Sequence, residues 1–264
     1  GVFATGSISR EVADRLLATL RRYAAVCRRD GALVRAVATS AVREARNGAE
    51  IVRRAAAEAG LDLEVVSGRE EARLICLGVL QGKSAGARSL VLDIGGGSTE
   101  VATAVGEEPT ALHSVALGAV RLTEMFGTAA RASPERLALV RSYAAEAFRE
   151  GLPHRFPHPR AALGSSGTIN AVIGFAASEG RSATRKEIGR AVEVLAAMGL
   201  EERRRHFEPR RAEIVVAGAI ILEAAVRHLG LGAVTSVDTG LRNGILVDLM
   251  RRAALERDDR SAAE

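Results

Sequence analysis

The sequence contains no tryptophan, and phenylalanine, tyrosine and tryptophan together make up only 3% of it. Proteins that bind single-stranded nucleic acids stack the bases on aromatic side chains. This scarcity argues against a specific nucleic-acid partner, even though the formal net charge is +5. Acidic residues are interspersed among the arginines, and the modest positive charge suits an anionic small or polymeric substrate as well as it suits nucleic acid.

Cysteine clusters and long apolar runs are also missing. The only two cysteines, Cys27 and Cys76, fall in segments with helical periodicity, which favours small core residues over a disulfide or a metal site. The longest apolar run, residues 214–222, is too short to cross a bilayer, and no signal peptide is visible. We therefore expect a cytoplasmic protein with no membrane partner.

The apolar residues that are present, 47% of 264, suffice for one large or two ordinary domains. In the first part of the chain, their periodicity predicts strands at 33–38 and 63–66 and helices at 12–27, 47–60 and 69–80. Alternating strands and helices favour an α/β layer architecture with parallel strands.

The following part has a different pattern. Strands are predicted at 89–94, 99–105 and 111–116, and their tight connecting turns indicate antiparallel pairing, so a domain change is expected near residues 70–87. Further strands are predicted at 160–163 and 234–237, and helices at 119–126, 134–149, 169–177, 185–198, 212–229 and 241–255. We interpret His154 and His158 as surface residues of a proline-rich connector, and we expect the charged tail 257–264 to be frayed.

The segment VLDIGGGSTE, residues 91–100, places three glycines between two predicted strands. Glycines adopt backbone conformations that other residues avoid, and they let the amides of residues 95–97 approach an anion, with the Ser98 hydroxyl as a further donor. Asp93 could hold a divalent cation, and strand alternation turns Glu100 to the same side as Ser98. We interpret the segment as a phosphate-binding hairpin beside a metal; the alternative is a simple flexible turn.

Two adjacent glutamates, Glu70 and Glu71, begin the helix that follows the second strand. Neighbouring residues on a helix point about 100° apart, so one carboxylate can face a cleft while the other faces solvent or a salt-bridge partner. A carboxylate in a cleft could orient and deprotonate an attacking water. Acidic residues in a first helical turn are also common because they interact favourably with the helix dipole.

Three other elements carry polar or basic residues after predicted strands or before a helix. Arg43 could bind a phosphate through two hydrogen bonds, or be an ordinary solvated arginine. The segment GSSGT, residues 164–168, could form a second anion loop or a polar turn that caps a helix. The basic run at 203–206 and the pair at 210–211 would suit a polyanion, although charge runs usually form a solvated face.

Together and in this order, the motifs resemble the exopolyphosphatase / guanosine pentaphosphate phosphohydrolase (Ppx/GppA) family of the actin-like ATPase superfamily. The motifs are ATSAVREARN (38–47), VVSGREEARL (65–74), VLDIGGGSTE (91–100), LGAVRLTE (117–124), GSSGTI (164–169), RRAEIVVAGAIIL (210–222) and DTGLRNGIL (238–246). The resemblance covers nearly the whole chain. It implies an α/β protein with the actin-like ATPase (ribonuclease H-like) fold, whose two domains lie around a cleft.

The resemblance also implies an activity and a set of site residues. The activity is Mg²⁺-dependent release of terminal phosphate from inorganic polyphosphate or guanosine pentaphosphate; a homodimer is a further expectation, since short members of the family are often dimers. Glu71 matches the catalytic carboxylate, and Asp93 and Glu100 match acids linked to the metal. Residues that match phosphate contacts are Arg43, Gly95, Gly96, Gly97, Ser98 and Arg211, and the second loop consists of Gly164, Ser165, Ser166, Gly167 and Thr168.

The chain departs from the family at its start. The family's first phosphate loop, a D-x-G-S-N-S turn, has no match, and the first residue is glycine rather than methionine. We therefore expect the first domain, residues 1–70, to be incomplete and this polypeptide to have reduced or no activity. Residues 71–248 would form the second domain, and residues 249–264 a helix and tail that could pack back on the first. A sensor that binds polyphosphate or nucleotide without hydrolysis is the alternative from another functional class.

Overall fold

The computed structural model describes residues 1–153, 156, 159 and 161–263, with side chains described as far as residue 255. The chain divides into two compact units: unit 1 comprises Gly1–Ser67 and Leu249–Glu264, and unit 2 comprises Gly68–Asp248. His154 and His158 lie outside the described residues. Among the described helices, none combines the length and the apolarity that a bilayer crossing requires.

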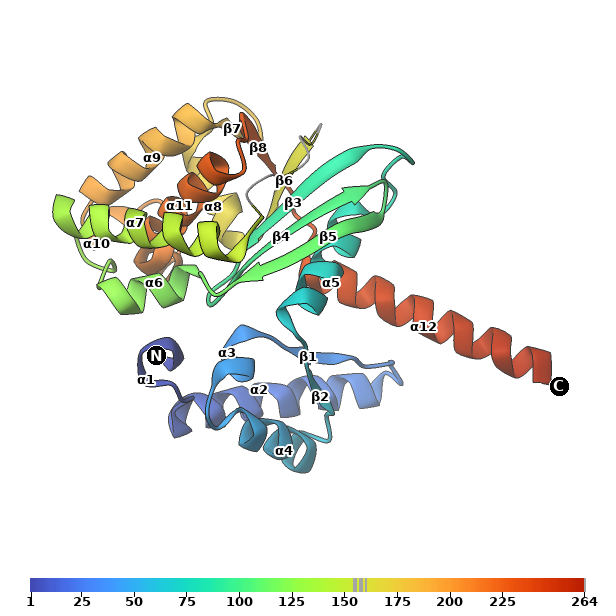
Figure 1. The fold of residues 1–264 in the computed structure, drawn as a ribbon. Coiled ribbons are helices and arrows are strands. Elements are labelled where there is room, and N and C mark those ends of the chain that lie inside the picture. The colour runs from blue at the N-terminus through green and yellow to red at the C-terminus, as the bar shows by residue number, and fades with distance from the viewer. Residues whose placement is uncertain (154–155, 157–158, 160, 264) are drawn as a thin grey trace. The chain divides into compact units, whose positions relative to one another are not determined.

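Unit 1 contains two short parallel strands and a set of helices, labelled in Figure 1: α1 (Val2–Thr5), α2 (Arg10–Arg29), β1 (Ala36–Ala38), α3 (Ser40–Glu44), α4 (Gly48–Ala59) and β2 (Leu63–Val65). The Ser9 hydroxyl caps α2 by accepting a hydrogen bond from the amide of Val12. The helices pack through small apolar residues, and Ala24 and Ala59 are buried together. The predicted strand at 33–38 is shorter than expected, because β1 begins at Ala36.

Unit 2 is built on a six-stranded sheet with the order β5-β4-β3-β6-β8-β7. Its strands are β3 (Arg88–Ile94), β4 (Thr99–Val105), β5 (Glu108–Val115), β6 (Ala161–Ser165), β7 (Ser182–Thr184) and β8 (Ala233–Ser236). The first three strands form an antiparallel meander, whereas β6 runs parallel to β3 and β8 parallel to β6. This is the ribonuclease H-like topology of the actin-like ATPase fold, and the predicted fold class is confirmed.

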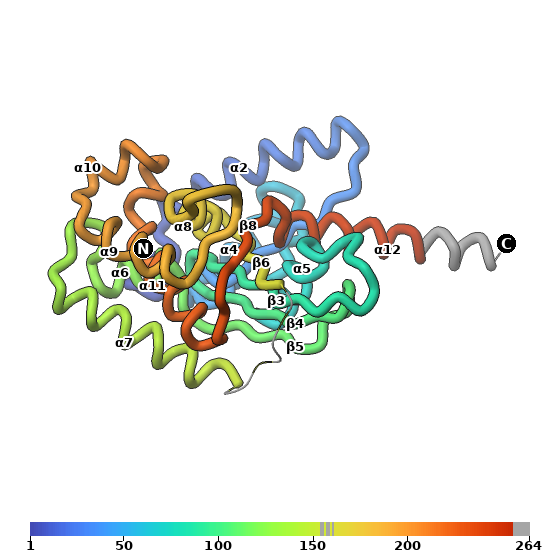
Figure 2. Tube along the Cα trace, turned by 90° about the horizontal axis from the view of Figure 1, so that it is seen from above, coloured from blue at the N-terminus to red at the C-terminus, as the bar shows by residue number. Residues whose placement is uncertain are grey.

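Each face of this sheet is covered by a different set of helices. One face packs on α6 (Ala119–Phe126), α7 (Pro134–Gly151), α8 (Gly167–Ala176), α9 (Arg185–Ala197) and α11 (Pro209–His228), with α10 (Leu200–Arg203) between the last two in sequence. The other face packs on α5 (Gly68–Leu80). Figure 2 shows α5 and the group α6–α11 on opposite sides of the strands. Side chains of β3 alternate between the apolar clusters on the two faces of the sheet. Leu90, Leu92 and Ile94 face the larger helical layer, and Val91 faces α5.

Helix α5 is fixed by close backbone contact with the start of α12 (Leu241–Ala263). A Cβ atom added to Gly244 would lie 1.7 Å from the carbonyl oxygen of Leu74. A Cβ atom added to Gly78 would lie 2.2 Å from the carbonyl oxygen of Gly240. Glycine is therefore required on both sides of this contact.

The predicted bounds agree with the structure where an element is long and regular: β4 and α6 have the predicted limits, and α5 begins one residue early. The tail that we expected to be frayed was predicted wrongly, since α12 continues to Ala263. No glycine or proline follows Gly244 to stop it, and alanine, leucine and arginine are good helix formers. Four short elements were missed, because three to five residues show no clear period: α1, α3, β7 and α10.

Candidate active site

A row of polar side chains crosses four neighbouring strands of the sheet in unit 2. The strand register pairs Ser114 with Glu100, Glu100 with Asp93, and Asp93 with Ser165. We call these four residues the acid row. Side chains at paired positions share a face, and this face is the one that packs on α5, because Val91 and Ala102 lie two residues away on the same strands.

The two carboxylates of the acid row are buried: Asp93 is 9% exposed and Glu100 2%. Burial raises the pKa of Asp93 to about 6, opposed by a hydrogen bond from Ser165 and assisted by the charge of Glu71. Burial and the charge of Glu71 raise the pKa of Glu100 to about 8. The Ser114 hydroxyl donates to Oε1 of Glu100 at 2.7 Å. Oε2 of Glu100 has no hydrogen-bond partner within the described part of the chain.

Glu71 and Glu70, adjacent in the first turn of α5, have different surroundings. Glu70 forms a two-armed ion pair with Arg73, whose Nε and Nη2 donate at 2.7 and 2.8 Å, and Arg73 also donates to Asp248 at 2.7 Å. Glu71 is only 7% exposed, and its charge acts on both carboxylates of the acid row. Three acidic side chains are therefore gathered at one end of the sheet.

The glycine hairpin between β3 and β4 is held by its carbonyl groups. The amides of Ala119 and Arg121 in the first turn of α6 donate to the carbonyls of Gly95 and Gly96, both at 3.0 Å. Nε of Arg121 donates to the carbonyl of Gly97 at 2.8 Å. In a trans peptide, the N–H of the next residue points away from the carbonyl. The amides of residues 96–98 therefore point away from α6, and no acceptor for them occurs among the described residues.

The reason for glycine in this hairpin differs from our expectation. None of Gly95, Gly96 and Gly97 has a positive φ angle, so the backbone conformation alone does not demand glycine. A Cβ atom on Gly96 would lie 3.2 Å from Cγ2 of Val120, a tight contact that requires a shift of only a few tenths of an ångström. Gly118 has even less space, since its Cβ atom would lie 2.3 Å from the carbonyl oxygen of Gly96.

The second predicted loop, residues 164–168, lies at the junction of β6 and α8 and meets Arg211 of α11. Nη1 of Arg211 donates to the Thr168 hydroxyl at 2.9 Å. A Cβ atom on Gly167 would lie 2.4 Å from Nη2 of Arg211, so glycine makes room for the guanidinium. Burial lowers the pKa of Arg211, as expected for a cation withdrawn from water.

Ser166, in the same loop, has φ 93° and ψ 152°, and it is the one non-glycine residue with positive φ among the described residues. This region of backbone space is normally restricted to glycine. The Ser166 hydroxyl accepts a hydrogen bond from the amide of Ile169 at 3.2 Å and so caps α8. A strained residue beside a half-buried arginine marks this loop as a functional candidate.

Some predicted residues lie outside this group. Arg43 belongs to unit 1, where its Nη1 donates to the carbonyl of Val66 at 2.7 Å. The basic run at 203–206 is not a continuous exposed surface, because Arg203 is fully buried and donates to the carbonyl of Ala129 at 2.6 Å. Sequence reasoning missed Ser114 and Arg121. Ser114 is recognised only from the strand register, whereas Arg121 is contained in the LGAVRLTE motif.

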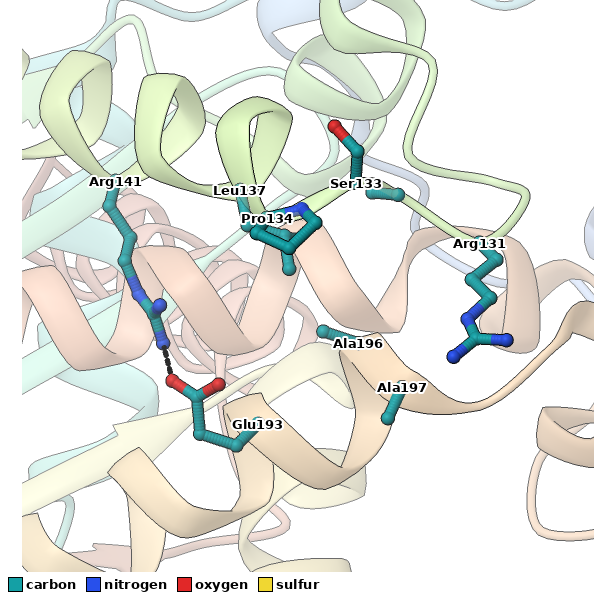
Figure 3. Close-up of a pocket in the computed structure, with 9 residues that line it drawn as sticks. Arg131, Ser133, Pro134, Leu137, Arg141, Glu193, Ala196 and Ala197 are labelled. Atoms are coloured by element: carbon teal, nitrogen blue, oxygen red, sulfur yellow. Dashed lines mark hydrogen bonds and ion pairs between the residues drawn. The ribbon is translucent and has the colours of Figure 1, made fainter.

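A cavity of about 540 Å³ elsewhere in unit 2 contains no member of the acid row. It lies between α7 and α9, and Figure 3 shows Arg141 paired with Glu193 across it. Its other charged lining residue is Arg131. In the described residues, no group of three or more histidine, cysteine, aspartate or glutamate side chains has the arrangement of a metal site. The candidate site is therefore defined by the carboxylates, the hairpin and the second loop.

Comparison with known proteins gives consistent matches over most of the chain. A model of the Ppx/GppA phosphatase family matches residues 1–253. The chain is similar to exopolyphosphatase 1 of Mycobacterium tuberculosis, with 32% identity over 259 residues that cover 92% of this chain and 75% of the relative.

Solved structures match as well. The Ppx/GppA family member from Aquifex aeolicus has a TM-score of 0.78 and 26% identity, and the match covers 96% of this chain and 85% of that one. An exopolyphosphatase from Cytophaga hutchinsonii has a TM-score of 0.80 and 25% identity, and the match covers 94% of this chain and 85% of that one.

Proposed function

The chain belongs to the Ppx/GppA phosphatase family, and on that premise we propose that it hydrolyses the terminal phosphoanhydride bond of inorganic polyphosphate with a divalent cation. The product is orthophosphate. The family places the chain among hydrolases that act on phosphoanhydrides. We propose inorganic polyphosphate rather than guanosine pentaphosphate as the substrate because several relatives are named exopolyphosphatases.

The observation that carries this proposal is the orientation of the glycine hairpin. Its three glycine carbonyls are taken up by α6 and Arg121, which leaves the amides of residues 96–98 as a set of donors directed away from α6. Consecutive backbone donors of this kind bind phosphate oxygens. Leu122 places α6 on the sheet face opposite to the acid row. The amide donors therefore point toward the acidic side of the sheet.

A phosphate bound at these amides would lie beside two buried carboxylates, and like charges repel. A divalent cation held by Asp93 and Glu100 would remove the conflict. The residues fit Mg²⁺: Asp93 and Glu100 offer the oxygen ligands it prefers, and Oε2 of Glu100 is buried without a hydrogen-bond partner among the described residues. Two carboxylates are enough, since Mg²⁺ commonly binds one or two together with substrate phosphates and water. When bound, the cation would neutralise charge on the phosphate oxygens.

Glu71 is the proposed general base. It is the buried member of the Glu70–Glu71 pair, and Glu70 is already engaged by Arg73. Glu71 would orient a water for in-line attack on the terminal phosphorus and accept its proton. The hairpin amides would stabilise the charge on the equatorial oxygens of the transferred group. Phosphoryl transfer depends mainly on such positioning and electrostatic stabilisation.

The second loop and Arg211 would bind the rest of the anion. Arg211 is held against Thr168, and a half-buried guanidinium interacts with a phosphate more strongly than a solvated one. Its Nη1 donates to an uncharged hydroxyl, so an arriving phosphate could replace that contact with a charge-assisted one. Arg43 of unit 1 remains a proposed phosphate ligand on the basis of its motif.

Release of orthophosphate from long-chain polyphosphate, tripolyphosphate and guanosine pentaphosphate, measured side by side with Mg²⁺ and with EDTA, tests the proposal. We expect release from polyphosphate that EDTA abolishes. Preferred release from guanosine pentaphosphate would reassign the substrate within the family. Binding of polyphosphate without release would indicate a sensor rather than a hydrolase.

Glu71→Gln tests the role of the base, because it keeps the size of the side chain and removes its proton affinity. Losing a general base typically costs about 10²–10⁴-fold in rate, so kcat should fall by that factor while polyphosphate binding persists. Glu70→Gln is the matched control, since it changes the neighbouring carboxylate that pairs with Arg73, and it should retain most of the activity. Equal losses in both variants would count against Glu71 as the base.

A further inference from the structure

We propose that Arg121 is a positioning residue: its guanidinium fixes the peptide group between Gly97 and Ser98, and it thereby keeps the hairpin amides aligned for phosphate. The inference rests on the proposed function, because it assigns a structural cause to the hairpin geometry used there. Arg121 lies in the first turn of α6 and is half-buried. It would not need to touch the reacting atoms.

The three carbonyl contacts of the hairpin are not equivalent. The carbonyls of Gly95 and Gly96 are bound by main-chain amides of α6, which every residue except proline provides. The carbonyl of Gly97 is bound by a side chain, Nε of Arg121, at 2.8 Å. The last peptide group of the hairpin is therefore the one whose orientation depends on the identity of a side chain.

Fixing this peptide group has a direct effect on Ser98. Its N–H belongs to the same rigid plane as the Gly97 carbonyl and points in the opposite direction. A hydrogen bond from a charged donor is roughly twice as strong as a neutral one, and it also polarises the peptide toward a stronger N–H donor. Ser98 is buried and lies two residues before Glu100, so movement of this peptide would disturb the acid row as well.

Arg121 could instead act only through its positive charge, and the two roles predict different behaviour. Lysine keeps the charge but lacks the planar group whose Nε lies close to the main chain. If Arg121 acts only through its charge, Arg121→Lys should keep wild-type activity. The activity lost in Arg121→Gln should then be smaller at high ionic strength, where exposed charges are screened. If Arg121 acts by positioning, Arg121→Lys should lose activity as Arg121→Gln does, and the loss should be the same at high salt.

The test measures kcat and KM for tripolyphosphate in Arg121→Gln, Arg121→Lys and Arg136→Gln, at low and high salt. Arg136 is an exposed arginine of α7 and controls for the loss of one positive charge. Small displacements at a reacting centre cost up to about a hundredfold in rate. We expect both Arg121 variants to lose about ten- to a hundredfold in kcat, with a smaller change in KM, and Arg136→Gln to resemble the wild type.

Amide hydrogen exchange at Gly95 and Ala119, read by NMR, provides a second measurement that does not require activity. Both amides donate within the hairpin and its contact with α6. Exchange should be faster in Arg121→Gln at an unchanged melting temperature. Full kcat in Arg121→Lys, or unchanged exchange in Arg121→Gln, overturns the proposal. If Arg121→Gln does not fold, amide exchange and kcat measured on Arg121→Lys test the proposal instead. A wild type that releases no phosphate refutes the proposed function, whereas exchange still decides the role of Arg121.

Discussion

Substitution of Gly244 by alanine should damage both stability and activity, because it separates α5 from α12. The added Cβ atom would lie 1.7 Å from the carbonyl oxygen of Leu74. An ordinary carbon–oxygen contact is about 3.3 Å, so the two helices must move apart by roughly 1.6 Å. Strain of this kind typically costs about 1–3 kcal/mol, which corresponds to about 2–12 °C in melting temperature for a unit of this size.

The effect on activity follows from the position of the proposed base, Glu71, on α5, one turn before Leu74. A displacement of about 1 Å at a catalytic group can cost about 10²-fold in rate, so orthophosphate release should fall by at least that factor. The measurements are thermal unfolding followed by circular dichroism and phosphate release from polyphosphate. The matched control is Gly174→Ala in α8, where no atom lies within 4 Å of the added Cβ atom. Alanine there should be neutral or stabilising by about 0.5–1 kcal/mol. A Gly244→Ala protein with wild-type melting temperature and activity would refute the argument.

Two further substitutions test other local features. Ser166→Gly should raise the free energy of unfolding, because relief of backbone strain gives about 1–3 kcal/mol whereas replacing a serine cap by glycine costs only a few tenths of a kcal/mol. Ser166→Ala should lower the free energy of unfolding. Urea titration of both variants separates the contribution of strain from that of capping. Glu187 caps α9 together with Thr184, and these hydrogen bonds hold its pKa at about 2, below the ordinary value of 4.5. Because the folded-state pKa is lowered, the stabilisation is present above pH 4.5 and is lost as the pH falls toward 2. Glu187→Gln should therefore be less stable than the wild type at pH 6 and approach it at pH 3, whereas Glu179→Gln, at an exposed residue outside the cap, should show no such trend.

The parts of the site that could be predicted from the sequence lie close together along the chain. Asp93 and Glu100 flank one hairpin, and the sequence indicated both as acids near a metal. Strand alternation placed Glu100 on the side of Ser98, and the register of β3 and β4 places Asp93 on the same face as Glu100. Helix geometry left open which of Glu70 and Glu71 faces the cleft, and only the family resemblance singled out Glu71. The structure separates them through Arg73 and Asp248, and Asp248 lies far along the chain.

Other parts depend on pairing across the sheet. Ser114 joins the acid row because β5 pairs with β4 in one register, and a single sequence does not give that register. The steric demand on Gly118 and Gly244 arises from backbone atoms of other elements. The conformation of Ser166 has no sequence signal, because a serine in a region normally restricted to glycine contradicts the local preference.

The length of the connection between β3 and β4 has a consequence for how this sequence can vary. Asp93 and Glu100 are paired residues, and only residues 95–98 separate the two strands. If one residue were inserted there and the pairing slipped by one, β4 would present its other side chains to each face. Glu100 would then enter the apolar layer that contains Ile94 and Val101. Both carboxylates would still be present in the sequence, but they would no longer share a face. The number of residues in this turn is therefore constrained as well as their identity, because it keeps Asp93 and Glu100 on one face of the sheet.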